Sequence, residues 1–277
     1  MSITSRASEL GSSLRTPYAL RRRAYAAAKR VGIWLGLPVA LVTAWWFASA
    51  GSTDFYRPSL RRIMQAFAET WFGPRLVEDV LPSLARLAVG YAIALLLGIA
   101  LGVAIGSSVR TRAVTEPALE FLRAIPPPIL VPVIMLFAGI DDGMKVIVIV
   151  FGCIWPILLN AVEGVRATDE VLTDTCRVYG VNPLRHLIVR AASPQIMTGA
   201  RQALSIGIIL MVISEMVAAS SGLGFTVVQF QRGFQIPEMW SGVLLLGLIG
   251  VTLAAIFRFA EHKILGWYHG SRDADRR

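Results

Sequence analysis

Long apolar stretches alternate with shorter polar ones along most of this chain. A stretch of about 20 apolar residues is long enough to cross the hydrocarbon core of a bilayer as an α-helix. Stretches of this kind predict six membrane-spanning helices, and most Lys and Arg residues fall in the polar segments between them. The predicted spans are residues 31–50, 84–105, 115–137, 146–161, 197–219 and 240–259. This pattern favours an all-α integral membrane protein.

The third predicted span is interrupted. Residues 115–123 are amphipathic, and Pro126, Pro127 and Pro128 separate them from an apolar run, 129–137, that is too short to cross alone. Three consecutive prolines remove three backbone donors and cannot lie inside a regular helix. At membrane depth such a break survives where it is buried in protein or lines a cavity, and broken helices often mark transport paths. The sequence leaves open a packing kink and a transport path.

A long polar interruption, residues 165–201, separates the fourth and fifth spans. Its first part predicts a short helix that ends at Gly180, because glycine readily adopts the left-handed conformation of a helix end. Pro183 suits the first turn of a following helix. Five arginines are spread along the interruption, which favours the cytoplasmic side. A compact helix tied to spanning helices at both ends can pass force from a soluble partner into the membrane.

The other polar segments suggest a topology. Residues 59–71 can form an amphipathic helix on the outer face. With six spans, both termini lie in the cytoplasm, where most Lys and Arg residues then fall. The predicted organisation is a basic cytoplasmic tail (1–30), a first span with its outer amphipathic segment (31–83), a core of five spans (84–267) that contains the loop 165–201, and a cytoplasmic tail (268–277).

Composition supports a membrane protein over a soluble or nucleic-acid-binding one. Of the 277 residues, 55% are hydrophobic and 16% are charged, whereas soluble domains are about 25% charged. The formal net charge is +9, but the basic residues lie in the gaps between apolar runs and not in one clustered basic surface. The charge therefore indicates membrane topology and contact with lipid, and we expect no nucleic-acid partner.

Three residues within the apolar stretches are candidates for a transport path: Pro127, Asn160 and Glu215. A carboxyl group at membrane depth is costly, so a functional role for Glu215 is the default hypothesis, with a structural partner near the outer interface as the alternative. The sequence contains no phosphate-binding loop, zinc-protease motif or nucleophile elbow, and its cysteines and histidines lack metal-ligand spacing. We therefore expect no catalytic residue, metal or cofactor in this chain.

Several short motifs follow one another in a recognisable order between residues 50 and 267. In the polar loop, Asp174, Thr175 and Cys176 are followed after three residues by Gly180. The other segments are 83–86, 123–127, 137–140, 155–160, 214–216 with 222–224, and 260–267. Together they resemble the permease subunit of ATP-binding cassette (ABC) importers, in the branch that handles aliphatic sulfonates, taurine, nitrate and related solutes. That family has a cytoplasmic loop with the pattern Glu-Ala-Ala, three residues, Gly, which docks on the ATPase.

The resemblance implies a type I ABC importer permease fold in the bacterial cytoplasmic membrane. It implies a second copy of the permease, two ATPase subunits that hold ATP and Mg, and an extracytoplasmic solute-binding protein as partners. The solute would be small and anionic. The implied ATPase-coupling residues are Asp174, Thr175, Cys176, Arg177, Tyr179, Gly180, Val181, Asn182 and Pro183.

Another class of function is also compatible with the residues. The interrupted third span and the scattered membrane acids would suit a stand-alone channel or an ion-coupled secondary transporter. Many secondary transporters carry internal repeats, and none is evident here, so we expect the energy source to be another chain. The sequence does not name the solute.

Overall fold

A computed structural model describes residues 36–182 and 187–268, and every regular element in these ranges is helical. An unlabelled helix, Gly36–Ser49, comes first. The labelled elements are α3 (Leu60–Trp71), the π-helix η1 (Leu76–Val80), α4 (Leu81–Gly106), α5 (Val109–Ala124), α6 (Pro127–Ala138), α7 (Asp142–Arg166), α8 (Glu170–Val178), α9 (Val189–Ala218), α10 (Leu223–Arg232) and α11 (Ile236–Ile264). The all-α prediction is confirmed for this part of the chain.

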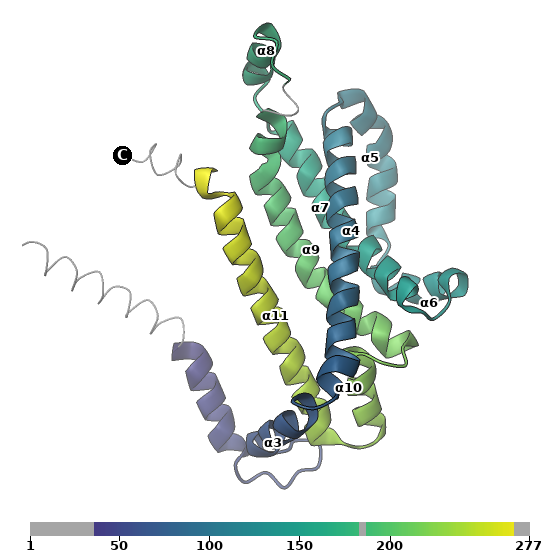
Figure 1. The fold of residues 1–277 in the computed structure, drawn as a ribbon, viewed down its shortest axis with the longest axis vertical. Coiled ribbons are helices and arrows are strands. Elements are labelled where there is room, and N and C mark those ends of the chain that lie inside the picture. Colours follow the sequence, from purple (N-terminus) through teal and green to yellow (C-terminus); the bar gives the residue numbers. More distant parts are fainter. Residues whose placement is uncertain (1–35, 183–186, 269–277) are drawn as a thin grey trace, which may run out of the picture. The chain divides into compact units, whose positions relative to one another are not determined.

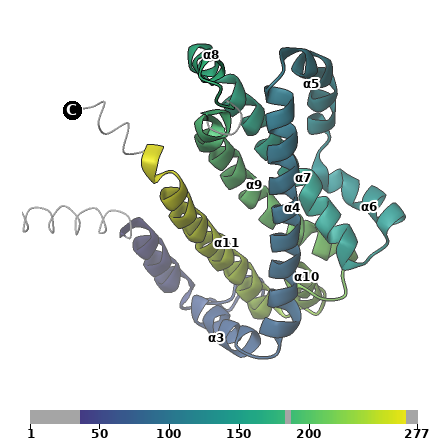
Figure 2. The same cartoon turned by 45° about the horizontal axis from the view of Figure 1, so that its top comes forward.

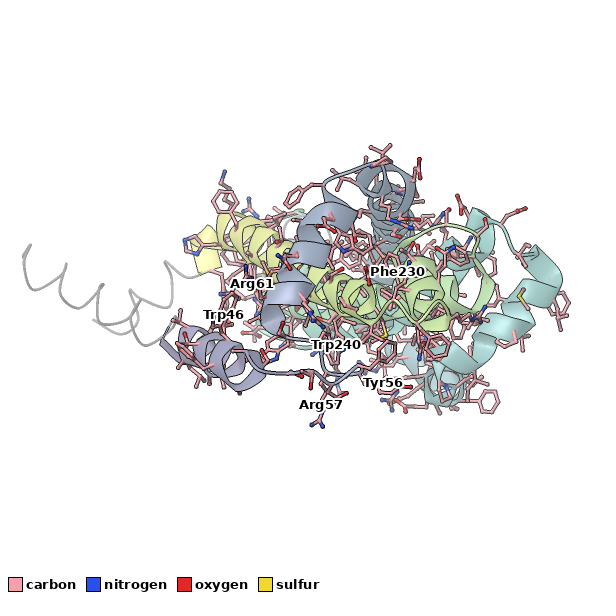
Figure 3. The ribbon with its side chains drawn as sticks, turned by 90° about the horizontal axis from the view of Figure 1, so that it is seen from below. Trp46, Tyr56, Arg57, Arg61, Phe230 and Trp240 are labelled. Atoms are coloured by element: carbon pink, nitrogen blue, oxygen red, sulfur yellow. The ribbon has the colours of Figure 1, made fainter. Side chains whose placement is uncertain are left out.

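The chain divides into two compact units, residues 1–64 and 65–277. In the first, a loop joins the helix Gly36–Ser49 to the start of α3, and Figure 3 labels Tyr56 and Arg57 in this loop. The backbone N–H of Tyr56 and the side chain of Arg57 donate hydrogen bonds to Asp54 at 2.9 and 3.0 Å. These two donors hold the pKa of Asp54 below its usual value. The loop is therefore stabilised by local polar contacts.

Three long helices, α4, α7 and α9, form the centre of the second unit (Figures 1 and 2). Helix α7 packs against both α4 and α9. The contact with α4 is close because glycines face α7: a Cβ atom on Gly98 would lie 2.8 Å from Cγ2 of Ile157. A Cβ atom on Gly102 would lie 2.7 Å from the backbone oxygen of Leu158. Small residues at this spacing let helices approach closely in membranes.

Four helical segments are long and apolar enough to cross a membrane: Leu76–Gly106, Asp142–Arg166, Val189–Ala218 and Ile236–Ile264. Helices α5 and α6 pass the same test as a pair, with a bend of 91° between them. The predicted break in the third span is therefore confirmed. The described residues give four spans, or five if the bent pair counts as one. They also include the apolar helix Gly36–Ser49 from the predicted first span, whose residues 31–35 lie outside the described residues.

The short helices lie at the two ends of the second unit. Helix α8 lies at one end, and α10 with the start of α11 lies at the other (Figure 1). Figure 3 labels Phe230 on α10 and Trp240 on α11 at this second end. There the Trp71 ring meets Phe230 edge-on, with centroids 6.4 Å apart, and its indole N–H donates to Ser241 at 3.0 Å. The amphipathic helix predicted at 59–71 is confirmed as α3.

Candidate functional site

The predicted coupling segment forms the short helix α8 and the turn that follows it. The side chain of Asp169 caps the start of α8 by accepting a hydrogen bond from the backbone N–H of Val171 at 2.8 Å. At the other end, Gly180 has a φ of +66°, and the N–H of Val181 donates to the carbonyl of Cys176 at 2.8 Å. This is the glycine-terminated helix end expected from the sequence.

Helix α8 presents both apolar and charged side chains to its surroundings. Val178 is 83% exposed and Tyr179 is 78% exposed. Arg177 donates to Asp174 at 2.9 Å, and both side chains of this pair are also exposed. Exposed apolar side chains on a small helix are a common feature of protein-binding surfaces. Pro183, the last of the predicted coupling residues, lies outside the described residues.

A cavity of about 500 Å³ lies between the end of α5, the start of α6, and helices α7 and α9. Its lining includes Pro127 and Asn160, two of the three residues predicted for a transport path, together with Gln202. The amide nitrogen of Asn160 donates to the carbonyl of Pro156 at 2.8 Å and to the Gln202 side-chain oxygen at 3.4 Å. The cavity therefore lies between the bend that joins α5 to α6 and a hydrogen-bonded pair of polar side chains, Asn160 on α7 and Gln202 on α9.

Glu215, the third predicted path residue, is not among the lining residues of this cavity. Its side chain is completely buried, with 0% exposure. One carboxylate oxygen accepts hydrogen bonds from Ser83 Oγ and Arg86 Nη1, each at 2.7 Å. The other oxygen accepts from the backbone N–H of Gly224 at 3.0 Å. The charge is therefore paired, and both carboxylate oxygens accept hydrogen bonds, as a buried charge requires.

Arg86 extends this contact to a third long helix. Its Nε donates to Asp142 at 2.8 Å, and Lys145 donates to the same carboxylate oxygen at 3.3 Å. We refer to Ser83, Arg86, Asp142, Lys145 and Glu215 as the ion-pair cluster. It joins α4, α7 and α9 towards the α10 end of the unit.

Sequence reasoning found Glu215 but not its partners, because Arg86 lies 129 residues earlier in the chain. The one feature of the sequence that pointed to Arg86 is its position as a charged residue at the start of an apolar stretch. Among the described residues, no group of three or more His, Cys, Asp or Glu side chains is placed to hold a metal ion.

A family model and two relatives that match this chain all carry names of membrane components of transport systems. The family model described as "Binding-protein-dependent transport system inner membrane component" matches residues 94–264. The aliphatic sulfonates transport permease protein SsuC of Escherichia coli (strain K12) is 30% identical, with 87% of this chain and 94% of the relative covered. The taurine transport system permease protein TauC of the same organism is 25% identical, with 87% and 91% covered.

A solved structure also resembles this chain. A chain of the MetNI methionine ABC transporter, solved in inward-facing conformations, superposes with a TM-score of 0.56 at 22% identity. The match covers 69% of this chain and 94% of that one. At this identity the likeness concerns the fold.

Proposed function

Because the chain belongs to the family of binding-protein-dependent transport system inner membrane components, and is thus a permease subunit of an ABC importer, we propose how it assembles and couples. The family implies an ATPase and a solute-binding protein as partners. We propose a dimer of two permease copies, two ATPase subunits bound at α8, and an extracytoplasmic binding protein, in the bacterial cytoplasmic membrane. ATP and Mg are held by the ATPase, and this chain is non-catalytic.

The proposed solute is a small anion. The relatives named for aliphatic sulfonates and taurine align over most of their length with this chain, and both names denote solutes that carry a sulfonate group. Delivery by a binding protein gives that separate chain a large part in selectivity.

The observation that carries the coupling proposal is helix α8, held between two spanning helices and ended by a left-handed glycine. In the proposed cycle, ATP closes the ATPase dimer and draws the two α8 helices together. The permease then opens outward to the loaded binding protein, and hydrolysis resets it inward. The apolar side chains of Val178 and Tyr179 and the pair Asp174–Arg177 form the proposed contact with the ATPase.

The proposed solute path passes the cavity that Pro127 and Asn160 line. Glu215 is proposed to act on the path indirectly, by fixing α4, α7 and α9 to one another through the ion-pair cluster.

The coupling proposal is tested by two substitutions at Gly180. A side chain there would meet nothing within 4 Å, but the φ of +66° is a conformation that L residues rarely adopt. Asparagine tolerates this conformation far better than a β-branched residue does. We therefore expect Gly180→Val to reduce solute uptake and solute-stimulated ATP hydrolysis by at least about tenfold, and Gly180→Asn to retain most of both. Both variants should insert into the membrane at wild-type levels. Normal coupling in Gly180→Val would refute the proposed role.

A further inference from the structure

We propose that the cavity between α5, α6, α7 and α9 binds a small organic anion, whose oxyanion group faces Arg123 and Gln202 and whose apolar part packs on the cavity wall. The inference rests on the proposed function, since it assigns a solute class to the path. It assigns a solute-binding site to the permease itself, in addition to the site at which the separate binding protein selects the solute.

Charge is the first observation. Arg123 is the only charged side chain among the described residues that line this cavity. It donates one hydrogen bond, from Nη2 to Glu120 at 2.5 Å, and both partners of that pair are about half exposed. A guanidinium group has five N–H donors, so most of them stay available. Arginine binds carboxylate and other planar or branched oxyanions through paired hydrogen bonds.

Hydrogen bonding is the second observation. The side-chain oxygen of Gln202 accepts from Asn160, which leaves the –NH2 group of Gln202 as the part that can donate to a ligand. Trp155 also lines the cavity, but its indole nitrogen is buried within the protein and does not open onto the cavity. Because the Gln202 –NH2 group is a donor, a ligand that supplies acceptor oxygens suits this wall better than one that supplies donors.

The apolar wall is the third observation, and it narrows the class of anion. Prolines, leucines and isoleucines make up much of the remaining lining: Pro127, Pro128, Leu159, Ile206, Ile209 and Leu210. Nitrate and bicarbonate have no apolar part to place against such a wall, whereas an alkyl sulfonate has one. Burial of each methylene group contributes about 0.8 kcal/mol. The cavity thus favours an organic anion over a small inorganic one.

Position supports a transport role for this site. The lining residues of α7 run from Gly152 to Asn160, in the middle part of a helix that spans Asp142–Arg166. A cation that faces a cavity at such depth is a functional residue by default. Helices α5 and α6 meet at a bend of 91°. Because of this bend, Arg123 at the end of α5 and Pro127 at the start of α6 line the same cavity as α7 and α9.

The test uses the full-length chain in lipid nanodiscs, with its tryptophan indole nitrogens labelled with ¹⁵N. The Trp155→Phe variant identifies the Trp155 indole resonance. We expect ethanesulfonate and taurine to shift this resonance saturably, with nitrate at least about tenfold weaker (about 1.4 kcal/mol). The neutral compound dimethyl sulfone should leave it unchanged. No shift with either sulfonate, or an equal shift with dimethyl sulfone, would overturn the anion site.

Variants provide the second arm of the test. Arg123→Gln and Gln202→Leu should each weaken ethanesulfonate binding at least about tenfold. Arg110→Gln is the matched control, because Arg110 lies on the same helix, α5, and is not among the lining residues of this cavity. Equal affinity of Arg123→Gln and Arg110→Gln would overturn the assignment.

Uptake separates this inference from the proposed function. In the complex with its ATPase and binding protein, Arg123→Gln should lower ethanesulfonate uptake relative to Arg110→Gln. If the wild-type complex imports sulfonate and Arg123→Gln matches it, the site is refuted and the permease role stands. If the wild-type complex imports no solute at all, the proposed function itself fails.

Discussion

Glu215 illustrates how this protein retains a charge in its interior. The carboxylate is fully buried and accepts hydrogen bonds from Ser83, Arg86 and Gly224. Removal of two charges from water costs several kcal/mol for each charge, and the short contact with Arg86 together with the hydrogen bonds from Ser83 and Gly224 offsets this cost. A buried pair of this kind specifies one arrangement of helices, here α4 against α9, more than it adds stability.

Loss of one partner should therefore be costly. Arg86→Met leaves Glu215 buried without its cation, and we expect a loss of about 3–5 kcal/mol in stability. The matched change Arg177→Met breaks the exposed pair with Asp174, and exposed pairs contribute about 0–1 kcal/mol. Thermal unfolding in detergent measures both variants. Similar melting temperatures for the two would show that the Arg86–Glu215 pair is not important for the fold.

Single residues were predictable from the sequence where the bilayer constrains them, and their partners were not. Glu215 and Pro127 stand out because a carboxylate and a proline break are unusual in apolar stretches. Arg123 and Gln202 do not stand out. Arg123 lies in the last turn of α5, where polar residues are common, and Gln202 is an uncharged residue within α9. Their meeting in one cavity depends on the bend between α5 and α6 and on the crossing of α7 with α9. The hydrophobic periodicity of the sequence predicts neither the angle of this bend nor the crossing of these two helices.

At the scale of elements, the contact between α4 and α7 depends on missing side chains. A Cβ atom added at Gly102 would lie 2.7 Å from the backbone oxygen of Leu158, which cannot swing away as a side chain can. Helix packing in membranes relies on such close backbone approach. The two helices must separate to admit even one methyl group.

Gly102→Ala should therefore destabilise the protein by about 1–3 kcal/mol, as overpacking does. Gly247→Ala is the control: Gly247 lies in α11, and a Cβ atom there would meet nothing within 4 Å. Because alanine favours helix by about 1 kcal/mol over glycine, the control should be neutral or stabilising. Chemical or thermal unfolding of both variants in the same detergent decides the question. A stabilised Gly102→Ala protein would contradict the close contact.

Elements were predicted well in type and less well in extent. The amphipathic pattern at 59–71 gave α3 nearly residue for residue, and the glycine signal gave the end of α8. The fourth and fifth spans were predicted as 146–161 and 197–219, whereas α7 and α9 begin at Asp142 and Val189. Hydropathy detects only the part of a helix that can lie in hydrocarbon. Backbone hydrogen bonding carries a helix on through polar residues beyond that part.

At the scale of the whole molecule, the structure describes most of the predicted membrane spans. Six apolar stretches predict six spans, and the described residues provide four, or five with the bent pair. The first predicted span, residues 31–50, is described only in part, as the helix Gly36–Ser49, because residues 31–35 lie outside the described residues. The orientation of the chain is therefore best tested on α7, whose span is clear.

Helix α7 has 25 residues, which at 1.5 Å per residue gives a length of about 37 Å. This exceeds the hydrocarbon core, which is about 30 Å thick. The turn before Asp142 and helix α8 after Arg166 should therefore lie on opposite membrane faces. The proposed coupling role requires α8 to be the cytoplasmic one.

Native cysteines make this orientation measurable. Cys176 lies in α8 and is partly exposed, whereas Cys153 is completely buried and should not react. With the chain expressed without its ATPase, we expect a membrane-impermeant maleimide to label Cys176 in inside-out vesicles and not in intact spheroplasts. In a Cys176→Ser background, Asp141→Cys should show the opposite pattern, because Asp141 precedes the other end of α7. Labelling of Cys176 from outside intact spheroplasts would place α8 beyond the reach of any cytoplasmic ATPase and would exclude the coupling mechanism.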